Sequence, residues 1–310
     1  MTQPTPQNPG LLNWLLIIVL GMIWGGAFMS VRLALDGFAP LTVAALRVSI
    51  AALCLLIIGQ ILGQGIGRVS RDAGSLGWRF AVILGTVSIA APLTLLSWGQ
   101  QFVPSALAGV AMGAVPLLVL PLVYVFSPEE GIGPRRVFGI VLGFCGLCLL
   151  IGPSAFGGTA NAFGFWGGAA CIIAACGYAI GSVVTRRAPT MPPITLASAT
   201  LCVASAILVP LALWFDGWPS SWPAKPTQAI LFAALFPTAL AAVIRVRVVT
   251  TAGSLFMSLT SYQVPVWSVI FGVTLMNESL PQNVFLALAL ILTGIGISQS
   301  RSLISMLRRN

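Results

Sequence analysis

The chain has 310 residues, of which 58% are hydrophobic and only 7% are charged, whereas a soluble domain of this length carries roughly a quarter charged residues. Its net charge of +9 comes from 15 basic and 6 acidic residues that stand singly or in pairs between apolar runs. Such spacing argues against nucleic-acid binding and against a separate soluble domain, and it favours a protein that crosses a membrane many times.

Ten apolar segments follow one another along the chain, and each is long enough to cross roughly 30 Å of hydrocarbon as a helix. They cover residues 12–35, 40–62, 77–98, 104–126, 134–152, 163–185, 193–215, 227–250, 252–274 and 281–299. Pro, Gly, Asn and charged residues separate them, least clearly near residue 250. We therefore predict an all-α integral membrane protein with ten transmembrane helices. The first segment follows residues without a basic region, so we expect it to stay in the membrane.

Basic residues fall unevenly on the two sides of these ten segments. If residues 1–11 form a cytoplasmic tail, twelve basic residues lie on the cytoplasmic side, two lie outside and Arg47 lies within a span. The inner set is Arg68, Arg71, Arg79, Arg135, Arg136, Arg186, Arg187, Arg245, Arg247, Arg301, Arg308 and Arg309, and the outer set is Arg32 and Lys225. The positive-inside rule then predicts that residues 300–310 form a second cytoplasmic tail.

Short motifs of the first five segments recur in the same order in the last five. The matches pair Trp24–Ser30 with Cys176–Ser182, Pro40–Thr42 with Pro193–Thr195, Pro92 with Pro237, Val115-Pro116 with Val264-Pro265, and Glu129 with Glu278. We predict a first repeat over residues 12–152, a periplasmic linker over 153–162 and a second repeat over 163–299. Because five is odd, the second repeat enters the membrane upside down, as in carriers that open alternately to either side of a central cavity.

Polar and aromatic side chains inside the spans are the candidates for this cavity. They are Trp24, Ser30, Thr94, Trp98, Tyr178, Ser182, Ser258, Tyr262, Gln263 and Trp267. The most polar stretch runs from Ser258 to Gln263, and lipid would penalise the Gln263 amide. Aromatic residues at span ends are alternatively anchors at the membrane surface.

Prolines within spans and one arginine are the candidates for hinges and gating. Pro92, Pro116, Pro237 and Pro265 recur as matched pairs, although membrane helices also tolerate proline without a hinge. Arg47 lies roughly 10 Å into its span at 1.5 Å per residue. It pairs with a substrate carboxylate or gates the outer mouth, or else it snorkels or binds helix-end carbonyls; we favour the structural role.

Glycines four residues apart let helix backbones approach closely. The pairs are Gly21/Gly25, Gly109/Gly113, Gly139/Gly143 and Gly177/Gly181. We expect them to pack within the chain, which would be a monomer or a weak dimer formed through one such pair. Cys145 and Cys148 lie in an apolar segment without histidine, so we expect packing and neither a metal nor another cofactor.

All six carboxylates fall at span ends or in loops, and the sequence contains no histidine. Proton-coupled transport and organic-cation export usually need an acidic or histidine side chain inside the membrane. A facilitator of neutral or zwitterionic solutes therefore fits better. A membrane enzyme would need acids or histidines clustered at one membrane depth, and the sequence shows no such cluster. A non-transporting scaffold is the other alternative, and it predicts that no accessible cavity exists.

These motifs resemble the drug/metabolite transporter superfamily, specifically its ten-helix EamA-type members. The resemblance rests on Trp24–Phe28, on Pro40 with Arg47, on the two Val-Pro pairs and on the Glu129 and Glu278 loops, and it covers residues 12–299. The loop around Glu129 departs from the pattern by its length and charge. The whole chain is similar to bacterial aromatic amino acid exporters.

The resemblance implies a basket of spans one to four and six to nine around a central cavity, with spans five and ten outside. It implies export of amino acids, aromatic ones included, and related metabolites across a bacterial inner membrane. The remaining alternative among transporters is a multidrug exporter of hydrophobic small molecules.

Overall fold

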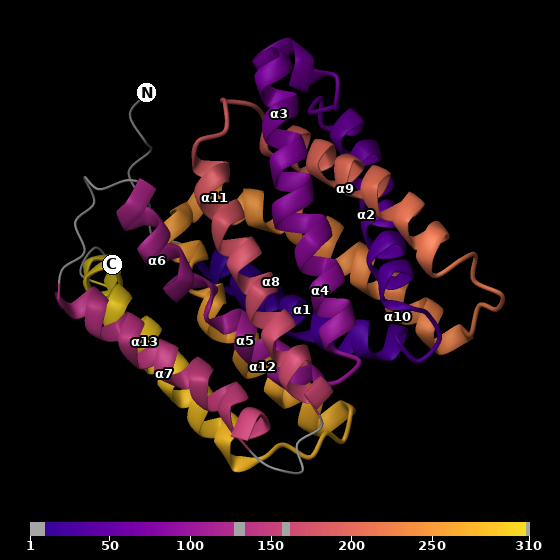
Figure 1. Cartoon of the computed structure of the whole chain (residues 1–310). Coiled ribbons are helices and arrows are strands. Elements are labelled where there is room, and N and C mark those ends of the chain that lie inside the picture. Colours follow the sequence, from indigo (N-terminus) through magenta and orange to yellow (C-terminus); the bar gives the residue numbers. More distant parts are fainter. Residues whose placement is uncertain (1–9, 127–133, 157–161, 308–310) are drawn as a thin grey trace.

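The structure is a computed structural model. It describes residues 10–126, 134–156 and 162–307, and within these ranges every regular element is a helix. Figure 1 shows a bundle in which most helices run along one another, with α1 near its centre. Helices satisfy their backbone hydrogen bonds internally, which a segment in lipid must do.

Proline positions explain several helix starts in both halves of the chain. Pro40 and Pro193 are the first residues of their helices, where a missing N–H leaves no hydrogen bond unmade. The helices of the first half are α1 (Gly10–Ala34), α2 (Pro40–Ile61), η1 (Val69–Ala73), α3 (Gly74–Leu84), η2 (Gly85–Ala90), α4 (Ala91–Gly99), α5 (Ser105–Gly113), α6 (Val115–Phe126) and α7 (Pro134–Phe156).

The helices of the second half follow a similar order. They are α8 (Ala162–Arg186), α9 (Pro193–Phe215), α10 (Ala224–Ala234), η4 (Leu235–Leu240), α11 (Ala241–Met257), α12 (Thr260–Leu275) and α13 (Gln282–Leu307). The segments η2 and η4 are π-helical turns, and each continues directly into the α-helices on both sides.

Six helical segments of the described chain are long and apolar enough to cross a membrane. They are Gly10–Ala34, Pro40–Ile61, Val69–Gly99, Gly164–Arg186, Pro193–Phe215 and Ala224–Gly253. The predicted spans 104–126, 134–152 and 281–299 overlap shorter apolar helical stretches, and span 252–274 overlaps α12. The chain is thus an all-helical multi-pass membrane protein, and the number of ten spans stays a prediction.

Prolines lie at most of the interruptions within these segments. Pro92 follows η2, Pro237 lies inside η4, and Pro116 follows the break between α5 and α6 at Ala114. Pro265 differs, because α12 continues through it. The predicted join near residue 250 lies slightly later: α11 kinks at Gly253, whose φ of 89° suits glycine.

The helices pack in a few close pairs. Helices α7 and α13 run side by side along one edge of the bundle (Figure 1). Helix α2 packs along α9, α12 lies against both α1 and α5, and α8 contacts α4, α5 and α6. Elements that are far apart in the sequence therefore form the interior together.

The predicted glycine pairs all contact another helix of the same chain. Gly25 faces Trp267 and Gly113 faces Pro265, so both sides of α12 meet glycine-lined backbone. Gly177 faces Pro92 in the same way. Because glycine has no Cβ, the two helix axes can approach closely, and dispersion contacts between the helices then stabilise each helix pair.

Loop side chains cap three helix N-termini. The Asp216 carboxylate accepts from the Thr42 backbone N–H (2.8 Å) and hydroxyl (2.9 Å) at the start of α2. At the start of α9, the Gln64 side-chain oxygen accepts from the Ile194 backbone N–H (3.4 Å), and the Thr195 hydroxyl donates to the Gln64 backbone carbonyl (2.8 Å). Glu278 accepts from the backbone N–H groups of Ser105 (2.7 Å) and Ala106 (3.1 Å), which begin α5.

Candidate functional site

Arg47 is a half-buried cation among apolar helices. It lies two turns into α2, and its Nε donates to the Thr238 hydroxyl of η4 at 3.1 Å. The Tyr178 hydroxyl of α8 is near enough to interact with it electrostatically. Arg47 therefore joins three elements that are far apart in the sequence.

The π-helical turn η4 orients the partner of Arg47. Pro237 has no N–H to give to the carbonyl of Ala233, four residues earlier. The Thr238 hydroxyl donates to that carbonyl instead, at 2.9 Å. Its proton is thereby committed, and its lone pairs are left to accept from Arg47.

Trp24 binds the neighbouring residue of the same turn. Its indole Nε1 donates to the Pro237 carbonyl at 3.1 Å. Two consecutive residues of η4 thus hold Trp24 of α1 and Arg47 of α2, and Tyr178 of α8 interacts electrostatically with Arg47. Four elements, two from each half of the chain, converge at this point. We call Trp24, Arg47, Tyr178 and Thr238 the central cluster.

No carboxylate of the described residues pairs with Arg47. Asp216 and Glu278 cap helices, Asp72 pairs with another arginine, and Asp36 is exposed. A charged side chain at the centre of a membrane helix costs roughly 3 kcal/mol or more. The central cluster therefore holds a positive charge whose counter-ion is missing from the part of the chain that the structure describes.

The predicted polar stretch of α12 lies elsewhere. The Tyr262 hydroxyl donates to the Ile295 carbonyl of α13 at 3.2 Å. The Gln263 side chain packs on α1 at Gly21, and Trp267 stacks on Phe271 with ring centroids 5.6 Å apart. Ser258 lies in the turn between α11 and α12. This stretch joins α1, α12 and α13, and its predicted role in substrate binding is untested.

The remaining candidates are dispersed. The Ser30 hydroxyl is buried and donates to the Ala27 carbonyl of its own helix at 2.8 Å. Thr94 and Ser182 are half-buried. Trp98 is 36% exposed at the end of α4 and contacts Phe102 edge-on, as a membrane-surface anchor would. The structure does not join these four to the central cluster through any hydrogen bond of the described residues.

Two side chains that make these contacts are not predicted from the sequence, namely Thr238 and Glu278. Thr238 is a lone hydroxyl in an apolar run, and its only signal is its place directly after an intramembrane proline. Glu278 is one of the residues that match between the two predicted repeats, but nothing in the sequence indicates that it caps α5. Its predicted counterpart Glu129 lies outside the described residues.

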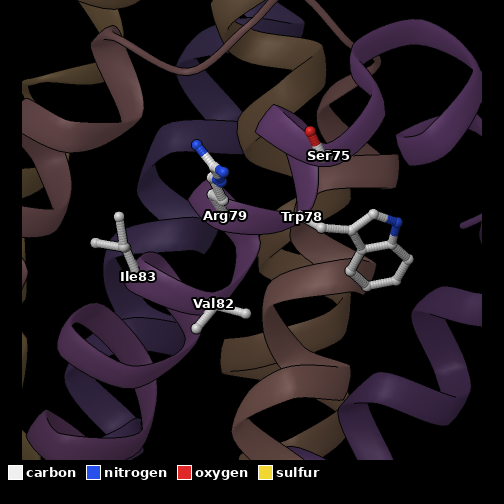
Figure 2. A pocket seen from close by; sticks show the side chains of 5 residues that line it. All are labelled: Ser75, Trp78, Arg79, Val82 and Ile83. Carbon is white, nitrogen blue, oxygen red and sulfur yellow. The ribbon is translucent and has the colours of Figure 1, made fainter.

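Two surface hollows lie apart from the central cluster. One of about 560 Å³ lies along α3 between Ser75, Trp78, Arg79, Val82 and Ile83, and Figure 2 shows Trp78 and Ile83 on its opposite sides. Another of about 110 Å³ lies between α6 and α8, where its lining includes Leu122 and Ile180. Both are mainly apolar, apart from Ser75 and Arg79 in the first and Arg187 in the second, and neither contains a predicted site residue.

A known protein family and a solved structure both match most of the chain. The sequence model described as the EamA-like transporter family matches residues 12–152 and 165–298. A solved crystal structure superposes with a TM-score of 0.66 at 21% identity, covering 94% of this chain and 98% of the other. This likeness concerns the fold.

Curated relatives of similar length are transporters by description. The uncharacterized transporter YoaV of Bacillus subtilis is 24% identical over 90% of this chain and 94% of its own. The uncharacterized inner membrane transporter YedA of Escherichia coli is 26% identical over 90% and 88%. A probable terminal-alkyne amino-acid exporter of Streptantibioticus cattleyicolor is 22% identical over 94% of both chains.

Proposed function

Because the chain belongs to the EamA-like transporter family, we propose that it exports amino acids, aromatic ones included, across the bacterial inner membrane by alternating access. In this proposal ten helices form two inverted repeats, residues 12–152 and 163–299, with both termini in the cytoplasm. The substrate binds at the central cluster, which both repeats contribute.

The convergence of α1 and α2 on the π-helical turn η4, with α8 interacting with Arg47, is the observation that carries the proposal. Carrier sites of inverted-repeat proteins lie at the repeat interface, beside interrupted helices. The central cluster has both properties, since η4 is a π-helical interruption and the four elements come from the two predicted repeats. A group bound there would contact both halves and sense their relative motion.

The helix caps support an inverted arrangement. Thr42 begins α2 and binds Asp216, which follows α9, while Thr195 begins α9 and binds Gln64, which follows α2. Each predicted repeat thus supplies a hydrogen-bond acceptor for the matching threonine hydroxyl of the other. Packing has a similar reciprocity, since α1 contacts α10 and α12 while α8 contacts α4 and α5.

Amino acids suit the chemistry of the central cluster. Trp24 and Tyr178 provide aromatic surface for an apolar side chain, and Arg47 provides a positive charge. The described carboxylates cap helices, pair with arginine or are exposed, so among them there is none to recognise an organic cation. The description of the Streptantibioticus relative as a probable amino-acid exporter points to a related substrate class.

Purified protein in liposomes tests the proposal. We expect uptake of labelled phenylalanine without an imposed proton gradient, with competition from other large amino acids. Flux only under a proton gradient would refute the facilitator mechanism. Transport of hydrophobic dyes that amino acids do not inhibit would instead favour a multidrug exporter.

A further inference from the structure

We propose that the Arg47 guanidinium is the carboxylate-binding group of the central cluster, and that the site takes ligands carrying one carboxylate. The inference rests on the proposed function, because it assigns a chemical class to the same site. It assigns Arg47 a ligand in place of the structural role that its depth in the membrane alone suggests.

The hydrogen bonding of Arg47 leaves most of its donors available. A guanidinium has five N–H donors in a planar fork. Within the described residues Arg47 makes one hydrogen bond, from Nε to Thr238, and no ion pair. The terminal nitrogens are the ones that a carboxylate binds through two parallel hydrogen bonds. A ligand carboxylate would also neutralise a charge that burial penalises.

Thr238 fixes the direction of this fork. Its hydroxyl donates to the Ala233 carbonyl and accepts from Arg47 Nε. The guanidinium is therefore held at Nε, which leaves its two terminal nitrogens for a ligand. Ordering a long side chain before a ligand arrives reduces the entropy lost on binding. We therefore assign Thr238 as a positioning residue for Arg47.

Of the two matching positions in the predicted repeats, only the one in the first repeat carries a positive charge. When the two repeats are aligned by matching Thr42 with Thr195, the residue that corresponds to Arg47 in the second repeat is Thr200. The Thr200 hydroxyl donates to the Ala197 carbonyl of its own helix at 2.8 Å. The site thus offers one positive charge, which balances one carboxylate. A dianionic phosphate would remain half-neutralised there.

The aromatic neighbours suit the other parts of an amino acid. The indole N–H of Trp24 is bound to the Pro237 carbonyl, so its remaining contact surface is the apolar ring. Aromatic faces attract both apolar groups and ammonium ions. The carboxylate would therefore bind at α2, and the rest of the ligand would lie toward α1 and α8.

Binding of phenylacetate and its neutral analogue phenylacetamide tests the inference separately from transport. A thermal-shift series at constant ionic strength would compare wild-type protein with Arg47→Gln and with the control Arg79→Gln, which changes an exposed arginine of α3. We expect phenylacetate, but not phenylacetamide, to raise the unfolding temperature of wild-type and Arg79→Gln protein, and to leave Arg47→Gln unchanged. Equal shifts with both compounds, no shift with either, or a shift that persists in Arg47→Gln would overturn the inference.

The unfolding temperature of the ligand-free protein distinguishes a ligand-binding role of Arg47 from a purely structural one. If Arg47 only braced α2 against η4, Arg47→Gln would lower the unfolding temperature of the ligand-free protein. A binding role predicts equal or higher stability, because the variant removes an unpaired buried charge. A lower unfolding temperature would therefore contradict the inference.

Transport assays distinguish the two proposals. We expect wild-type liposomes to carry phenylalanine but not phenylalaninamide, and Arg47→Gln to lose about tenfold or more of the phenylalanine flux, as expected for a charge-assisted pair. Selective binding of phenylacetate without amino acid flux would refute the proposed substrate and leave the carboxylate site standing. Amino acid flux that is unchanged in Arg47→Gln would refute the site and leave the proposed function standing.

Discussion

At the scale of single residues, the central cluster depends on one π-helical turn, whose Thr238 hydroxyl and Pro237 carbonyl hold Arg47 and Trp24. The sequence identified Trp24 and Arg47 as candidates but could not join them, because the contacts run between residues about 200 positions apart. It also favoured Gln263, whose side chain lies against Gly21 of α1 and whose role in substrate binding stays a prediction. Composition shows which polar groups lie in a span, but not which helix each one faces.

Thr238 gives the first prediction at this scale. Replacing it with valine removes the acceptor for Arg47 while keeping a β-branched side chain of similar size. We expect phenylalanine flux of the Thr238→Val variant to fall several-fold, mainly through a higher KM, because the guanidinium loses its fixed direction. Thr238→Ser keeps the hydroxyl and should retain most of the flux. Equal losses in both variants would show that any change at this position impairs transport, and would contradict a specific role of the hydroxyl.

Gly109 gives a prediction about packing. A Cβ there would overlap the Ser268 side chain of α12, whereas a Cβ at Gly164 in α8 meets nothing within 4 Å. We expect Gly109→Ala to destabilise the protein by about 1–3 kcal/mol through overpacking. Gly164→Ala, the matched control, should leave the unfolding temperature almost unchanged. Thermal unfolding in detergent measures both, and similar values would contradict the close contact of α5 with α12.

At the scale of elements, Glu278 joins the α12–α13 loop to the start of α5. Its carboxylate binds two N–H groups of the first turn of α5, and a negative charge also interacts favourably with a helix N-terminus. The predicted topology puts this contact at the outer side. We therefore expect it to hold that end of the bundle closed.

Removal of this cap should open the outer end. A cysteine replacing the buried Ser105, in a background without other cysteines, would report access from outside. We expect Glu278→Ala to increase its labelling rate and to cost about 0.5–2 kcal/mol of stability, as a lost N-cap does. Asp216→Ala removes the cap of α2 and is the matched control. Labelling that rises equally in both variants would indicate general loosening and not a local gate.

At the scale of the whole molecule, the sequence predicted the fold class well and its details less well. An all-helical membrane protein of the EamA-like family follows from hydropathy and ordered motifs, because apolar runs of about 20 residues span lipid as helices that satisfy their own backbone hydrogen bonds. The π-helical turns and the interruption at Ala114 could not be predicted, since a proline permits a break without specifying it. Within the described residues, six segments are long and apolar enough to span the membrane, so ten remains the proposed number.

The topology gives a prediction for the intact molecule. Ser221 is exposed in the loop between α9 and α10, and Ser75 is exposed at the start of α3. If both termini are cytoplasmic, a cysteine at position 221 reacts with a membrane-impermeant reagent on intact cells, whereas one at position 75 reacts only after permeabilisation. The reverse pattern would invert the orientation that the basic residues predict.

The central claim is that the molecule is an alternating-access carrier of amino acids, and counterflow tests it most directly. Liposomes containing the purified protein would be loaded with unlabelled phenylalanine and diluted into a trace of labelled phenylalanine, with no ion gradient. The account predicts transient accumulation of label above its equilibrium level, since a carrier exchanges substrate across the membrane through one site. Label that rises only to its equilibrium level, or that fails to enter, would contradict the account.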